Sequence, residues 1–94
     1  MNVGDLDEVQ YDLEVDGEQV REQLSRRVWE KAGWATVAIA FREKDKAGDW
    51  KEPKLALFRF RKLDEVWKKQ ASFTLGGAEA AQLGAALTEW FTSS

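Results

Sequence analysis

The stretch Leu57-Phe58-Arg59-Phe60-Arg61-Lys62 alternates phenylalanine with arginine. Successive side chains of a β-strand point to opposite faces of the sheet. Phe58 and Phe60 would therefore share one face, and Arg59 and Arg61 the other. The pattern predicts a strand between an apolar core and a basic surface.

The composition predicts one small globular domain. The chain has 94 residues, enough for a single core. No apolar run approaches the ~20 residues of a membrane helix, and the acidic start Met1–Asp5 does not resemble a signal peptide. We expect a cytoplasmic protein with no membrane partner, associated with the nucleoid if the cell is bacterial.

The residue types present limit the possible chemistry. The chain has no cysteine and no histidine, which removes disulfides, zinc sites, thiol nucleophiles and imidazole bases. It also has no Walker loop, G-x-G-x-x-G motif or EF-hand spacing. We therefore expect a protein that is not an enzyme and that binds neither a metal nor a small-molecule cofactor.

Charge divides the chain in two. Seven of its 17 acidic residues lie in residues 1–19, which contain no base, whereas all 14 bases lie in residues 20–94 with the other ten acids. We interpret 1–19 as an acidic, partly disordered arm with a candidate strand at 9–15, and 20–94 as a nucleic-acid binding domain. The arm could compete with nucleic acid for a basic surface.

Alternation of apolar and polar residues predicts four strands, followed by a helix after Gly76-Gly77. The expected strands span about 24–31, 34–43, 54–63 and 66–75, and the expected helix spans 78–91. The segment 20–31 also fits a helix, because Val20, Leu24 and Val28 are spaced by four residues. The predicted fold is α+β: a curved four-stranded antiparallel sheet and one C-terminal helix, with the candidate N-terminal strand as an optional addition.

Strand parity, without bulges, assigns each side chain to a face. The helix stripe Ala80, Leu83, Leu87, Trp90 and Phe91 would cover the core face. The residues expected on the core face are Leu24, Val28, Val37, Ile39, Phe41, Ala56, Phe58, Phe60, Ala71, Phe73 and Leu75. Those expected on the opposite face are Ser25, Arg27, Trp29, Lys31, Trp34, Thr36, Ala38, Ala40, Arg42, Leu57, Arg59, Arg61, Lys68, Gln70, Ser72 and Thr74.

This second face would carry six bases, two tryptophans and no acid. Cations can contact phosphates, and nucleobases can stack on indoles, so the face suits single-stranded nucleic acid. Duplex recognition in the major groove favours a basic helix or ribbon, and the expected helix has no Lys or Arg. The loop containing Lys44, Trp50, Lys51 and Lys54 could extend the binding surface; it also fits a solvated hairpin tip.

The order of parts resembles a known family. Four strands and a helix, with "VAIAFREKDKAGDWKEPK" (37–54) and "ASFTLGGAEAAQLGAALTEW" (71–90), resemble the single-stranded DNA binding domain of the positive-cofactor-four transcriptional coactivators. The layout is also similar to Whirly and Pur-alpha proteins. The resemblance implies a homodimer with a channel for single strands, backbone contacts from Arg42, Lys44, Lys51 and Lys54, and base stacking on Trp34 or Trp50.

We therefore expect a largely sequence-independent single-stranded DNA or RNA binding protein that acts as a homodimer in transcription, replication or repair. The expected dimer interface contains Leu83, Leu87, Trp90 and Phe91. The alternative is a protein-interaction module or small adaptor whose basic face docks an acidic partner. The expected nucleic-acid-binding residues are Arg27, Trp29, Lys31, Trp34, Arg42, Lys44, Trp50, Lys51, Lys54, Arg59, Arg61 and Lys68.

Overall fold

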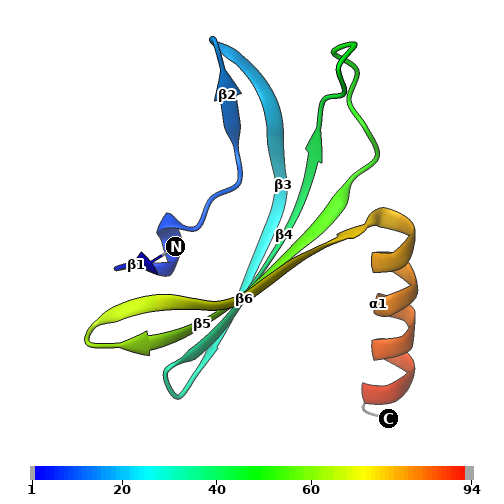
Figure 1. Cartoon of the computed structure of the whole chain (residues 1–94). Coiled ribbons are helices and arrows are strands. Elements are labelled where there is room, and N and C mark those ends of the chain that lie inside the picture. The colour runs from blue at the N-terminus through cyan, green and yellow to red at the C-terminus, as the bar shows by residue number, and fades with distance from the viewer. Residues whose placement is uncertain (1, 93–94) are drawn as a thin grey trace.

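The computed structural model describes residues 2–92. It contains one antiparallel sheet and one α-helix, joined end to end (Figure 1). The elements are β1 (Asn2–Val3), the 3₁₀ helix η1 (Leu6–Glu8), β2 (Leu13–Val15), β3 (Glu18–Lys31), β4 (Trp34–Glu43), β5 (Lys54–Leu63), β6 (Val66–Gly76) and α1 (Gly77–Phe91).

The sheet confirms the expected α+β class but has six strands, in the order β1-β6-β5-β4-β3-β2. The expectation of four strands was wrong because the N-terminal segment contributes a short strand at each edge. β1 pairs with β6 and β2 pairs with β3. The segment 20–31, for which a helix was the alternative, belongs to the 14-residue strand β3.

Tight turns connect the long strands into hairpins. The β2–β3 and β3–β4 turns have positive φ at Asp16-Gly17 and at Ala32-Gly33. Two consecutive left-handed residues match the right-handed twist of the flanking strands, and glycine adopts this geometry without strain. The β5–β6 turn uses Asp64-Glu65, where neither left-handed residue is a glycine.

The core lies on one face of the sheet and the N-terminal segment covers it. Val37, Ile39 and Phe60 are fully buried, as is Val9 of the covering segment, and Leu6 of that segment is also buried. The core also contains Ala35, Phe41, Ala56, Phe58 and Trp67, and Tyr11 packs its ring edge-on against Phe41 at 4.6 Å between centroids. Residues 6–11 of the segment expected to be an acidic competitor for the basic face therefore pack on the opposite face.

Polar contacts hold this segment in place. The half-buried Arg26 donates from Nε to the Val9 carbonyl at 3.1 Å and from Nη2 to the Leu6 carbonyl. Asp5 and Glu8 form a capping box around η1. Within the segment expected as a strand over 9–15, the observed strand is Leu13–Val15.

Helix α1 stands at the end of β6 and does not cover the core, contrary to the expectation from its apolar stripe. None of its residues is buried, and Trp90 is 66% and Phe91 75% exposed. Gly77 fixes the start of α1 close to the loop before β5, because a Cβ there would lie 2.6 Å from the Pro53 carbonyl oxygen. Within residues 2–92 no helix is long and apolar enough to cross a membrane.

Two β-bulges change which side chains face the core. The β3–β4 register shifts between Gln23 and Ser25, and the β5–β6 register shifts between Arg59 and Phe60. Each extra residue reverses the parity of the strand beyond it.

The expected face was therefore wrong beyond the β6 bulge. Phe73 pairs with Leu57, and Ala71 pairs with Arg59, so both lie on the same face as Arg59 and Arg61. Leu75 lies on that face too. Ser72 and Thr74 pair with core-face residues instead. Gln70 lies at the β6 bulge. Leu24 lies at the β3 bulge and is 45% exposed rather than buried.

Candidate nucleic-acid interface

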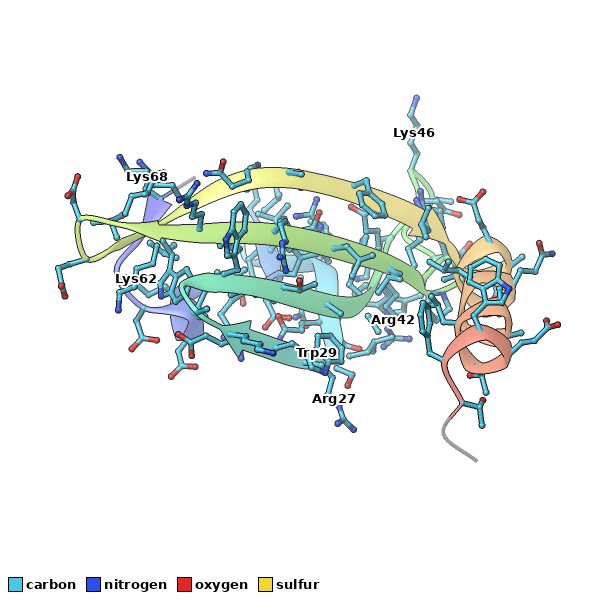
Figure 2. The ribbon with its side chains drawn as sticks, turned by 90° about the horizontal axis from the view of Figure 1, so that it is seen from below. Arg27, Trp29, Arg42, Lys46, Lys62 and Lys68 are labelled. Atoms are coloured by element: carbon cyan, nitrogen blue, oxygen red, sulfur yellow. The ribbon has the colours of Figure 1, made fainter. Side chains whose placement is uncertain are left out.

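The face opposite the core, here called the open face, is uncovered by any other element among the described residues. Strand pairing brings most of the predicted site residues together on it (Figure 2). The open face consists of Glu22, Ser25, Arg27, Trp29, Lys31, Trp34, Thr36, Ala38, Ala40, Arg42, Leu55, Leu57, Arg59, Arg61, Lys68, Ala71, Phe73 and Leu75.

Five bases of the open face form no ion pair with any carboxylate of residues 2–92. We call Arg27, Lys31, Arg59, Arg61 and Lys68 the basic region. The register brings them together across β3 to β6. Trp34 of β4 pairs with Lys31 of β3 and with Arg61 of β5, and Arg61 pairs with Lys68 of β6. Their positive charge is therefore available to an anionic ligand.

Trp34 lies at the centre of the basic region, beneath two guanidinium groups. The Cζ atom of Arg59 is 4.9 Å from the centroid of its ring and that of Arg61 is 5.2 Å away. Arg59 also donates from Nη1 to the Thr36 hydroxyl at 2.7 Å. These contacts orient both guanidinium planes, on which a nucleobase can stack as it does on an aromatic ring.

Trp29 is the more accessible tryptophan of the open face, with 59% of its surface exposed. It lies beside Trp34 in an open cleft of about 710 Å³ that Lys31 and Arg59 also line. Glu30, which points to the core face, contributes to the rim of this cleft. The cleft offers an aromatic surface next to cations, as stacking on a single strand requires.

The other predicted binding residues lie near α1, and three of their cations are already paired. Lys54 is not on the open face, because it lies opposite Phe41 on the core face. Arg42 contacts Glu22 at 2.9 Å, Lys44 contacts Glu18 at 2.9 Å and Lys54 contacts Glu43 at 3.7 Å. Trp50 lies under two of these cations. The centroid of its ring is 4.2 Å from Cζ of Arg42 and 5.1 Å from Nζ of Lys44. Lys51 is exposed beside Trp50.

Glu22 corrects the expectation that the open face carries no acid. The bulge at Leu24 moves Glu22 to this face, directly opposite Arg42 in the register. Parity alone would have placed Glu22 with the core residues. No sequence signal marked the bulge, and so the pairing with Arg42 was not predicted.

Sequence reasoning also missed an apolar region of the open face. Leu55 pairs with Leu75 and Leu57 pairs with Phe73, which is 54% exposed. A small cavity of about 140 Å³ lies between Leu57, Phe73 and their neighbours. Of the predicted interface residues, Leu83 is half-buried and Leu87, Trp90 and Phe91 are exposed.

Residues 2–92 contain no group of three or more acids that could hold a metal ion. Comparisons with protein-family models, curated proteins and solved structures find no match. The function is therefore inferred from the side chains of the open face.

Proposed function

We propose that this protein binds single-stranded DNA or RNA on its open face, with little dependence on sequence, and that it acts as a homodimer without catalysing a reaction. The observation that carries the proposal is the basic region: five cations interleaved with two tryptophans, none of them paired with an acid of the described chain. The resemblance to the positive-cofactor-four coactivators supports the same function, in transcription, replication or repair.

Electrostatics supports the choice of a polyanion as ligand. An unpaired surface cation gains little electrostatic energy within the protein. When it contacts a phosphate of a nucleic acid, however, a condensed counterion is released into solution. With five such cations, log K for a single strand should fall by about 3.5 per tenfold increase in salt, at about 0.7 per phosphate. This expected slope applies to one protomer.

The aromatic residues support a single strand rather than a duplex. Bases of a duplex are stacked on one another, whereas those of a single strand can stack on Trp29 and on the guanidinium groups above Trp34. Stacking contributes ~1–3 kcal/mol per base and tolerates every base type. The binding should therefore vary little between sequences.

The homodimer proposal rests on exposed apolar surface. Helix α1 presents Trp90 and Phe91 to solvent, and the open face presents Phe73. Large exposed apolar groups of this kind mark interaction surfaces, and a second copy of the chain offers the same groups to a two-fold interface.

A charge reversal tests the assignment to the open face. Arg59→Glu with Arg61→Glu should weaken binding of an oligo-dT by at least about 60-fold at 50 mM salt, if affinities converge near 1 M, because two phosphate contacts are lost. The matched control is Lys62→Glu in β5 with Lys69→Glu in β6, which changes the net charge equally but on the core face of the sheet. Equal losses in the two folded variants would contradict the assignment.

The apolar region favours one alternative, a protein-interaction module that docks an acidic partner. Salt dependence separates the two functions. A protein ligand would not give the steep slope expected for an oligonucleotide, and an oligonucleotide would then bind weakly at every salt concentration.

A further inference from the structure

We propose that Glu18 and Glu22 occupy the phosphate positions of a second nucleic-acid subsite, formed by Arg42, Lys44 and Trp50, and so keep that subsite closed until the carboxylates are displaced. This inference rests on the proposed function and adds its regulation. The subsite lies near α1, at the opposite end of the open face from Lys68 (Figure 2).

The three subsite residues have the composition of a single-strand contact. Two cations lie over one indole ring, at 4.2 and 5.1 Å from its centroid. Lys44 and Trp50 are held together by a β-bridge across the base of the β4–β5 loop. The backbone amide of Lys44 also donates to the Val20 carbonyl at 2.9 Å, which fixes this residue against β3.

The two carboxylates contact the cations where a phosphate would. Glu22 Oε1 accepts from Nε of Arg42, and Glu18 Oε1 accepts from Nζ of Lys44, each at 2.9 Å. A guanidinium group binds carboxylate and phosphate oxygens with similar geometry. Glu18 and Glu22 therefore neutralise the subsite in the free protein.

The Leu24 bulge is the structural cause of this arrangement. In a regular strand Glu22 would point to the core face, and Arg42 would be as free as Arg59. With the bulge, Glu22 is the direct cross-strand partner of Arg42. The same chain thus has an open group of cations at one end of the face and a closed group at the other.

The pairs are accessible enough to be exchanged. The side chains of Arg42 and Glu22 are 34% and 32% exposed, and that of Glu18 is 64% exposed. Exposed ion pairs contribute little to stability and are screened by salt. A strand bound at the basic region brings its next phosphates to a high local concentration, and these phosphates can displace the carboxylates.

Neutral isosteres of the two acids test the proposal. Glu18→Gln with Glu22→Gln should steepen the salt dependence of oligo-dT binding by about 1.4 in slope, about 0.7 for each freed cation. If affinities converge near 1 M salt, this difference amounts to as much as about 60-fold tighter binding at 50 mM.

The matched control removes two other acids of the same hairpin. Glu14 and Asp16 are exposed and form no ion pair within residues 2–92. Glu14→Gln with Asp16→Asn changes the net charge equally but frees no cation, and the slope should remain that of the wild type. Equal steepening in the two double variants would overturn the proposal and indicate a general charge effect.

Two further variants test which residues are responsible for the steeper salt dependence. Arg42→Gln added to the Glu18→Gln, Glu22→Gln variant should remove about half of the added slope, and Trp50→Phe in that background should reduce the additional fluorescence quenching. An unchanged slope with Arg42→Gln, together with unchanged quenching with Trp50→Phe, would contradict the proposed subsite. If the wild type binds oligo-dT but the isosteres change nothing, the closed subsite is wrong and the proposed function stands; if none of these proteins binds, both are wrong.

Discussion

The N-terminal segment should contribute to stability as part of the core, although its sequence resembles a solvated acidic arm. The perturbation that tests this role is Leu6→Ala with Val9→Ala. Leu6 is 8% and Val9 1% exposed, and both belong to the same cluster as Val37 and Ile39. Their loss would leave a cavity over the centre of the sheet.

The expected magnitude follows from the groups removed. Leu6→Ala deletes three buried carbons and Val9→Ala two, at about 0.8 kcal/mol each plus a term for the cavity. The expected losses in the free energy of unfolding are about 3 and about 2 kcal/mol, less any coupling between these neighbours. A domain of this size has a total of about 5–14 kcal/mol, so the double variant should lose at least about a third of its stability.

Urea denaturation at fixed protein concentration, followed by tryptophan fluorescence, measures this loss. The same segment supplies a matched control, Leu13→Ala with Val15→Ala, because these residues are 41% and 50% exposed. The control should cost less than about 1 kcal/mol in total, as surface changes do. Equal losses in the two variants would refute the reasoning that the segment covers the core.

Three further predictions concern a turn, a polar contact and the helix. Glu65→Gly should stabilise the protein by about 0.5–1 kcal/mol, because glycine relieves the left-handed strain at φ 67°, whereas Gly33→Ala should destabilise it. Thermal unfolding measures both changes in stability, and a destabilising Glu65→Gly would contradict the turn geometry. Arg26→Met should cost about 2 kcal/mol in urea denaturation by removing charged donors from the Leu6 and Val9 carbonyls, and a neutral result would show that these contacts contribute nothing. Trp90→Ser with Phe91→Ser should convert the proposed dimer to a monomer in light scattering, with the circular dichroism unchanged. A variant that remains dimeric would remove α1 from the interface.

Local sequence patterns predicted the elements whose side chains alternate clearly. The spans of β4 and β5 agree with the expected 34–43 and 54–63, and α1 begins at Gly77, one residue before the expected start. Alternation also placed Arg27, Trp29, Trp34 and Arg59 on one face, because no bulge interrupts that part of the sheet.

The remaining features depend on contacts between distant residues. The bulges opposite Phe41 and Phe60 reverse parity without any local signal, and they moved Phe73 and Glu22 to the open face. Leu6 is one apolar residue among acids, and only its position under the sheet explains its burial. The choice between the N-terminal segment and α1 as the cover of the core is likewise a property of the whole chain.

The most direct test of nucleic-acid binding on the open face is a titration of the wild-type protein with unlabelled oligo-dT, followed by tryptophan fluorescence at several salt concentrations. Binding on the open face should quench the fluorescence, and log K should fall by about 3.5 per protomer for each tenfold increase in salt. No quenching at micromolar protein and low salt, or an affinity independent of salt, would contradict it.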